Sequence, residues 1–231
     1  IIAYKELRAL EIKILEQLLL LRKAATGFEP SQLELIPKAQ QTLAASFQVE
    51  LFSRIEPSQF YGIEIDDFAH EIAILSLWLA QHQMNMKFKE IFGTTNPTLP
   101  LQAGGQIHCS NATRMAWEDV CPKQDGDEIY ILGNPPYKGF SQQDKNQKED
   151  LFFFLGATTK LDYISIWFLK GAQFINKFNA QFAFVSTNSI CQGEQVDLLW
   201  NSILKDGLEI GFARQSFKWT NNAKGNAGVT C

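Results

Sequence analysis

The sequence predicts an α/β fold in which a mostly parallel β-sheet carries helices on both faces. Short runs rich in β-branched and aromatic residues alternate with longer amphipathic stretches, which is the pattern of strands joined by helices. Of the 231 residues, 45% are hydrophobic and 20% are charged, so the chain can bury one sizeable core. No repeat, low-complexity tract or interdomain linker interrupts the alternation. These observations favour a single α/β domain.

The first half of the chain contains helix and strand candidates in alternation. Residues 1–23 are expected to form a helix, and its apolar residues are Leu7, Leu10, Ile14, Leu15 and Leu18. Residues 60–65 predict a strand. A helix then begins at Asp66 and Asp67 and extends to about Met84, and its apolar residues are Ile72, Leu75, Trp78 and Leu79. A short strand at 106–109 follows a turn-rich connection at 94–105.

The second half continues the same pattern. Strands are predicted at 129–133, 182–186 and 208–212, and another begins near Ala227. Helices are predicted at 163–174 and 195–204. The polar segment 138–150 is expected to be a mobile loop. The apolar runs 18–21 and 151–155 are too short to span a bilayer and are expected to lie on buried helix faces.

Composition argues against a free-standing DNA-binding domain, a metal-binding protein and a secreted protein. The net charge is -4 and the pI is near 5.5, whereas a free-standing DNA-binding domain usually has a basic surface. A basic cleft, or a basic domain elsewhere in a longer protein, stays possible. The four cysteines and three histidines show no paired spacing, so we expect free thiols and no metal site. No secretory signal is present, and a soluble cytoplasmic protein is expected.

The most informative segment is Asn134-Pro135-Pro136-Tyr137, which follows the predicted strand 129–133. Proline fixes φ and lacks an N–H group, so nearby carbonyls stay free to accept hydrogen bonds from another molecule. An amide oxygen beside a backbone carbonyl can accept both hydrogens of a planar amino group, and the tyrosine ring can stack on its heterocycle. The alternative is a strand followed by a proline-rich turn. The strand context favours a site for methylation of an exocyclic amine.

A second informative segment covers residues 60–66 and ends in acidic residues. A carboxylate at the tip of a strand in such a sheet can accept hydrogen bonds from ribose hydroxyls, and Glu64 is the candidate for this role. The alternative is an exposed acid that caps the next helix. Asp66 and Asp67 are expected to do only that.

Together these segments resemble adenine-specific DNA methyltransferases that use S-adenosylmethionine. The closest resemblance is to single-chain type II restriction–modification enzymes of the MmeI kind. It covers nearly the whole chain and is carried by residues 3–8, 60–67, 75–80, 133–137, 184–190, 216–219 and 225–231.

The resemblance implies a role for each matching residue in cofactor binding. Glu64 would hold the ribose of the cofactor, and Ile65 would pack beside its adenine. Asn111 falls where related enzymes often have an Asp that contacts this adenine, so it is either an adenine contact or an ordinary loop residue.

The resemblance also implies how the target base is held. Asn134 and the carbonyl of Pro135 would accept hydrogen bonds from the target amine, Pro136 would line the pocket, and Tyr137 would stack on the base. A second stacking face would come from Phe217 or from Trp219, although either ring could belong to the core.

The implied reaction is methyl transfer from S-adenosylmethionine to an adenine flipped out of double-stranded DNA. Two alternatives remain: methylation of an RNA guanine or a protein glutamine, and a catalytically silent module that contributes structure or DNA contacts. Family members carry a first strand and a glycine-rich cofactor loop ahead of the opening helix, and this sequence lacks both. It is therefore expected to be a partial methyltransferase domain, 1–231, without target recognition or nuclease domains.

Overall fold

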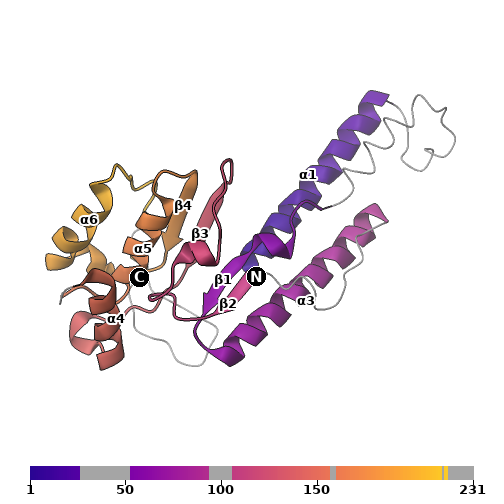
Figure 1. Ribbon diagram of the computed structural model, residues 1–231. Helices are drawn as coiled ribbons and strands as arrows, with labels where there is room; N and C mark the ends of the chain where they lie inside the picture. The colour runs from indigo at the N-terminus through magenta and orange to yellow at the C-terminus, as the bar shows by residue number, and fades with distance from the viewer. Residues whose placement is uncertain (27–52, 94–105, 157–159, 215, 218–231) are drawn as a thin grey trace. The chain divides into compact units, whose positions relative to one another are not determined.

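The computed structural model describes residues 1–26, 53–93, 106–156, 160–214 and 216–217 (Figure 1). The chain divides into two compact parts, Ile1–Ser110 and Asn111–Cys231. Each part contains a pair of parallel strands together with helices, so the fold is mixed α/β as predicted.

The first part contains two long helices and a parallel strand pair (Figure 1). Helix α1 (Ile2–Thr26) and helix α3 (Asp67–Phe92) pack against each other. Strand β1 (Tyr61–Glu64) pairs with β2 (Gln106–Cys109), from Tyr61 opposite Gln106 to Glu64 opposite Cys109. A short 3-10 helix, η2 (Pro57–Gln59), leads into β1. The predicted elements at 1–23, 60–65, 66–84 and 106–109 are therefore confirmed, and α3 continues about two turns further than predicted. The segments 27–37 and 94–105 lie outside the described residues.

The core of the first part lies between α1 and α3, but the predicted apolar faces are not the buried ones. The fully buried members are Tyr4, Ile12, Leu77, Ala80, Met84 and Phe88. Most of the residues predicted to be buried are exposed by 40% or more, namely Leu7, Leu10, Ile14, Leu18, Ile72, Leu75 and Leu79. Leu15 does pack against the core.

The apolar run at 18–21 was also predicted to be buried, and this was wrong, since Leu18, Leu20 and Leu21 are exposed. Helices α1 and α3 carry apolar residues on more than one side, so periodicity alone does not select the stripe that packs. The mutual contact of α1 and α3 selects the stripe that contains Tyr4 and Ile12 instead.

The second part is built on another parallel pair. Strand β3 (Ile129–Gly133) pairs with β4 (Ala180–Phe184), from Ile129 opposite Ala180 to Gly133 opposite Phe184. The longer helices are α4 (Lys145–Leu155) and α5 (Ser165–Ile175). A π-helical turn, η6 (Val196–Trp200), continues directly into α6 (Asn201–Leu204). Short 3-10 turns are η3 (Trp117–Asp119), η4 (Phe140–Gln142) and η5 (Asn188–Cys191).

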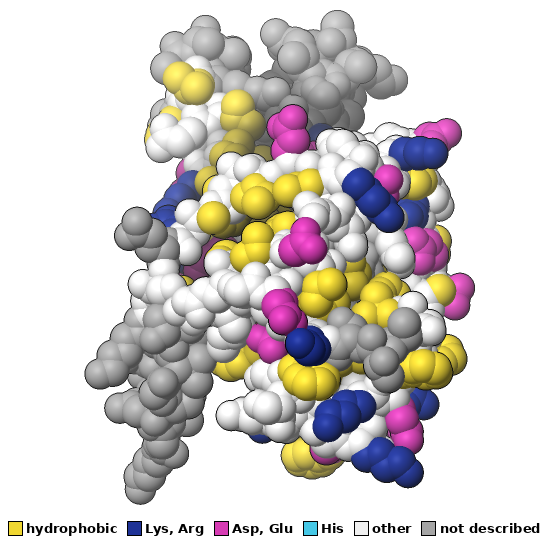
Figure 2. Space-filling view, turned by 90° about the vertical axis from the view of Figure 1, so that its left-hand side faces the viewer, with side chains coloured by type: hydrophobic (Ala, Val, Ile, Leu, Met, Phe, Trp, Pro, Cys, Tyr) yellow, Lys and Arg dark blue, Asp and Glu magenta, His cyan; other side chains and the backbone are white. Residues whose placement is uncertain are grey.

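Helix α5 supplies more of the buried core of the second part than any other helix or strand. Its fully buried side chains include Ile166, Phe168, Leu169 and Ala172. The Phe168 ring makes edge contacts with Phe182 and Phe184 on β4, at centroid distances of 5.9 and 5.5 Å. Hydrophobic side chains also gather on the outer face that includes α4 and α6 (Figure 2). Exposed hydrophobic residues on these helices and the adjoining η6 include Phe152, Phe153, Leu198 and Leu204.

Two predictions for the second part were wrong. The segment 138–150 was expected to be a loop, but it contains η4 and most of the first two turns of α4. Asp144 and Gln147 form a capping box, and the Lys, Gln and Glu residues that follow are good helix formers. Residues 208–212 are not a strand. Ile210 and Phe212 are exposed, and no strand within the described ranges pairs with them.

The other predictions for the second part were confirmed in kind. The helix at 163–174 and the strand at 182–186 are present as α5 and β4, shifted by one or two residues, and η6 with α6 accounts for 195–204. Leu151 is buried as expected, whereas Phe152 and Phe153 are exposed.

Cys109, Cys121 and Cys191 are free thiols, as predicted. The strand near Ala227 lies outside the described residues. Nowhere in the described ranges is a helix long and apolar enough to cross a membrane.

Candidate active site

Strand β3 ends at Gly133 and presents Asn134 at its carboxyl end. The N–H of Val185 donates to the carbonyl of Gly133 at 3.0 Å, so β3 and β4 are held together up to the residue before Asn134. Pro135 is buried, while Asn134 and Pro136 on either side of it are exposed. Tyr137 is partly buried and packs against the core of the second part. The local sequence thus fixes an exposed amide beside a rigid, anchored proline.

Asn134 and Pro135 keep hydrogen-bond acceptors available. Within the described part of the chain, neither the Asn134 side chain nor the Pro135 carbonyl takes part in a hydrogen bond. Burial of an unpaired polar group would be costly, but Asn134 is exposed and can bond to solvent or to a ligand. The Asn134 amide oxygen can therefore receive a donor from another molecule, and no described residue competes for the Pro135 carbonyl.

The carboxylate of Glu64 lies at the carboxyl end of β1. Its Oε1 accepts from the N–H groups of Ile65 and Asp66 at 2.9 and 3.1 Å, which fixes the side chain against its own backbone. Its Oε2 accepts no hydrogen bond from any described residue. Two apolar side chains that follow it in the sequence, Ile65 and Phe68, are 69% and 75% exposed. This arrangement offers one carboxylate oxygen and an apolar surface to a ligand.

Asp66 has the predicted capping role. Its carboxylate accepts from the N–H of Ala69 at 2.8 Å, and Asp67 lies in the first turn of α3. The prediction that Asp66 starts the helix is confirmed.

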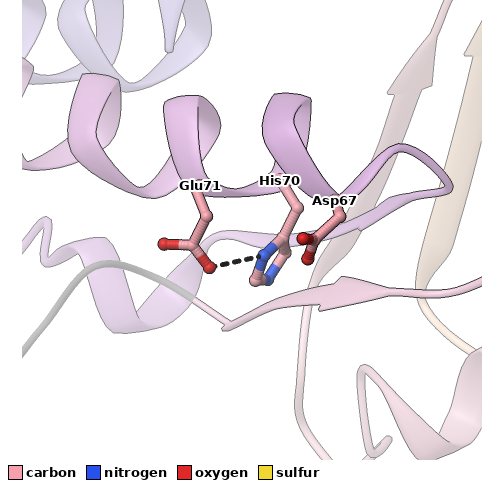
Figure 3. A group of neighbouring side chains, drawn as sticks. All are labelled: Asp67, His70 and Glu71. Atoms are coloured by element: carbon pink, nitrogen blue, oxygen red, sulfur yellow. Dashed lines mark hydrogen bonds and ion pairs between the residues drawn. The ribbon is translucent and has the colours of Figure 1, made fainter.

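A group formed by Asp67, His70 and Glu71 lies in the first turns of α3 (Figure 3). Their potential ligand atoms lie within 4.8 Å of one another. Both His70 ring nitrogens already contact protein atoms, since Nδ1 lies 3.2 Å from Glu71 and Nε2 lies 3.1 Å from the carbonyl of Ile107. The second contact joins α3 to β2, so His70 holds the helix against the strand pair that carries Glu64.

Asn111 uses its side chain within the second part. Its Oδ1 accepts from the N–H and the hydroxyl of Thr113 at 2.9 and 2.7 Å, and its Nδ2 lies 3.5 Å from Asp150 Oδ2. These bonds close the turn after β2. They match the interpretation of Asn111 as a loop residue, and they occupy the acceptor that an adenine amine would need.

The buried carboxylate of Asp150 joins this turn to α5. It accepts from Arg114 Nε and from the Tyr163 hydroxyl, both at 2.6 Å. Burial, together with the bond to Asp150, raises the pKa of Tyr163. The hydrogen bond that Arg114 donates to Asp150 raises the pKa of Arg114. No sequence pattern predicted this cluster. The polar residues that directly precede the strongly apolar helix α5 were a signal that could have located it.

The candidate residues are distributed over both parts of the chain. Glu64 and Ile65 belong to the first part, and Asn111, Asn134, Pro135, Pro136, Tyr137 and Phe217 belong to the second. Phe217 is 47% exposed, which is compatible with a stacking surface. Trp219 lies outside the described residues.

The family described as "MmeI, DNA-methyltransferase domain" matches residues 1–231, which is the entire chain. The chain belongs to this family. The match agrees with the Asn-Pro-Pro-Tyr segment after β3 and with the acidic segment at the end of β1.

Known proteins agree with the family assignment. A protein of Bacillus subtilis (strain 168) named DNA methyltransferase A is 47% identical over 233 residues, covering 99% of this chain. The solved structure of the type IIL restriction–modification enzyme MmeI in complex with DNA is 39% identical, with a TM-score of 0.77 over 100% of this chain. This MmeI-family chain spans 24% and 28% of the lengths of these two proteins.

Proposed function

We propose that this chain is the catalytic part of an enzyme that methylates the exocyclic amine of adenine in double-stranded DNA, with S-adenosylmethionine as methyl donor. One observation carries the proposal. Asn134 and the Pro135 carbonyl lie at the carboxyl end of β3 with their acceptors unbonded within the described residues. That is the chemistry a planar amino group requires, in a chain that belongs to a DNA-methyltransferase family.

Glu64 and Ile65 would hold the cofactor. The unbonded Oε2 of Glu64 suits the ribose hydroxyls, and the exposed Ile65 suits the face of the adenine ring. Asn111 is the weaker candidate because Thr113 occupies its acceptor oxygen.

The fold proposal follows from strand pairing. A doubly wound sheet of order 3-2-1-4-5-6 contains the parallel pairs 2-3 and 4-5. The parallel pairs β1–β2 and β3–β4 have the connectivity of those two pairs. We therefore propose a Rossmann-like methyltransferase sheet whose first strand and glycine-rich loop are not among these residues.

Catalysis would depend on positioning. The target adenine leaves the DNA stack at a cost of a few kcal/mol, which stacking on Tyr137 and contacts in the pocket offset. Asn134 Oδ1 and the Pro135 carbonyl accept the two amine hydrogens, so the nitrogen lone pair points away from them, and Pro136 keeps the loop rigid. S-adenosylmethionine supplies a methyl group on a sulfonium. Held by Glu64 and Ile65, it would give this methyl group to the amine nitrogen that Asn134 and Pro135 orient, with the carbon–sulfur bonding pair staying on sulfur and the amine proton passing to water.

The test is an Asn134→Ala substitution in the full chain. Loss of one preorganised polar contact of this kind lowers turnover by about 100-fold to 1,000-fold. We expect methylation of DNA to fall at least this far, with unchanged affinity for S-adenosylmethionine measured by calorimetry. The matched control is Asn179→Ala, which removes an exposed amide next to the amino end of β4 and should keep full activity.

Each other outcome identifies a different error. Undiminished methylation by the Asn134→Ala variant removes Asn134 from the site. A wild-type chain that binds no S-adenosylmethionine instead supports the alternative of a silent structural or DNA-contact module. Transfer to RNA or to protein, with none to DNA, supports the alternative amino-group acceptors.

A further inference from the structure

We propose that Asp162 is a positioning residue that holds the Asn134 loop in its reactive conformation. This inference rests on the proposed function, because it concerns the geometry of the same site. Asp162 lies immediately before α5, and no sequence pattern singled it out. Its side chain is 7% exposed.

The carboxylate of Asp162 joins the loops that follow the two strands of the second part. Its Oδ1 accepts from the N–H of Phe140 at 3.0 Å, and Phe140 lies six residues after Asn134. Its Oδ2 accepts from the hydroxyl of Ser189 at 2.5 Å, and Ser189 lies five residues after the end of β4. The Ser189 hydroxyl is also 2.7 Å from that of Thr187. One buried side chain thus fixes both loops at the carboxyl ends of β3 and β4.

The residues next to Asp162 hold the same loop through the backbone. The N–H of Tyr163 donates to the carbonyl of Lys138 at 2.8 Å. The amide of Gln143, which is 6% exposed, donates to Leu161 at 2.9 Å and to Lys138 at 3.3 Å. Because Lys138 directly follows Tyr137, these bonds anchor the proposed stacking residue as well as Phe140.

Asp162 is itself fixed from the opposite direction. The N–H of Asp162 donates to Gln195 Oε1 at 3.0 Å, and Gln195 Nε2 donates to the carbonyl of Lys160 at 2.8 Å. Residues 160–163 are therefore held in place by the segment that leads into η6. A positioning residue must itself be fixed, because its own motion would otherwise move the loop that it holds.

The buried charge of Asp162 also indicates a role beyond packing. In the described part of the chain, no Lys or Arg forms an ion pair with this carboxylate. Burial of a carboxylate is costly unless hydrogen bonds compensate, and here uncharged donors alone provide them. Charge-assisted hydrogen bonds are shorter and stronger than neutral ones, so they restrict the loops more tightly than an amide or hydroxyl would.

The experiment compares Asp162→Ala with Asp162→Asn and Asp144→Ala in the full chain, assayed for methyl transfer to DNA. The Ala variant releases Phe140 and Ser189, and a displacement of about 1 Å can lower kcat by about 100-fold. We expect that loss in kcat with an unchanged KM for S-adenosylmethionine. Asn keeps one acceptor for Phe140 and offers Ser189 a donor, so it should restore most of the lost turnover.

Asp144→Ala is the matched control because it removes a carboxylate that caps α4 without contacting the Asn134 loop. It should lower the melting temperature and leave kcat unchanged. Equal losses of kcat in the two Ala variants would reduce Asp162 to a general stabilising residue. An unchanged kcat in Asp162→Ala would overturn the proposal.

Hydrogen exchange gives a readout that needs no catalysis. The amides of residues 137–140 should exchange faster in Asp162→Ala than in the wild type, Asp162→Asn or Asp144→Ala. If this pattern holds while the wild type methylates no DNA, the proposed function fails and the anchoring role of Asp162 stands. If Asp162→Ala does not fold, Ser189→Ala decides instead, because it removes one of the two bonds. An unchanged kcat in that variant would overturn the proposal.

Discussion

Two asparagine side chains show how local bonding separates a candidate ligand from a structural residue. Asn111 closes a turn with Thr113, so its acceptor is occupied within its own segment. Asn134 follows a strand, precedes a proline and keeps its acceptor unbonded within the described residues. The residue type is the same, and the difference lies in the neighbours. Thr113 supplies two donors to Asn111, whereas Pro135 supplies no N–H group to Asn134.

Tyr4 gives a prediction at the same scale. Its side chain is 1% exposed, and desolvation by burial raises its pKa to about 12. The folded state therefore keeps the phenol proton at a pH where the unfolded chain, with a pKa near 10, has lost it. The contribution of Tyr4 to stability is complete below about pH 10 and is lost as the pH rises toward 12. Between pH 8 and pH 11, wild type should lose about 1.4 kcal/mol more free energy of unfolding than Tyr4→Phe.

Urea denaturation at the two pH values measures this difference. The Phe variant keeps the ring that makes an edge contact with Phe60 at 5.2 Å, so packing is preserved and only the titrating group is removed. Equal pH dependence in the two proteins would show that Tyr4 ionises as freely in the folded chain as in the unfolded one.

At the scale of elements, sequence patterns predicted most of the helices and strands that form, but not which side of each long helix is buried. The strands at 60–65, 106–109 and 129–133 were identifiable because β-branched and aromatic runs end at turn residues. The buried faces of α1 and α3 were not, because both helices are apolar on several sides. The helix after Asp144 was missed because its first turns are polar, although its capping box was legible in the sequence.

The contact between α5 and β4 gives a prediction for an element. Gly171 faces the strand, and a Cβ atom there would lie 3.2 Å from the Phe182 ring and 3.3 Å from the Phe184 ring. Gly171→Val should therefore force α5 away from β4 and lower the free energy of unfolding by about 1–3 kcal/mol. Thermal denaturation measures the change. Gln173→Val places the same side chain at an exposed position on α5 and should have a much smaller effect.

At the scale of the whole molecule, the candidate residues belong to two compact parts. The cofactor candidates Glu64 and Ile65 belong to the part that ends at Ser110, and the target-base candidates belong to the other. Sequence resemblance proposed roles for both groups, and the chain belongs to the family that the resemblance named. Composition and periodicity alone indicate neither group.

The overall charge of -4 bears on the proposed binding of DNA. Neutralisation of phosphates by Lys and Arg supplies most non-specific affinity for DNA, and this chain as a whole has an excess of acidic residues. Contacts to the target base and local basic residues would therefore have to supply more of the affinity for DNA than a general positive surface does. The chain spans about a quarter of the lengths of the relatives it matches.

Identification of the methylated atom tests the proposed function most directly. DNA is incubated with the full chain and labelled S-adenosylmethionine, digested to nucleosides and analysed by mass spectrometry. We expect N6-methyldeoxyadenosine in the wild-type digest and none above background with Asn134→Ala. Label found only on cytosine would contradict adenine as the target, and label absent from DNA while present on RNA or protein would contradict DNA as the substrate.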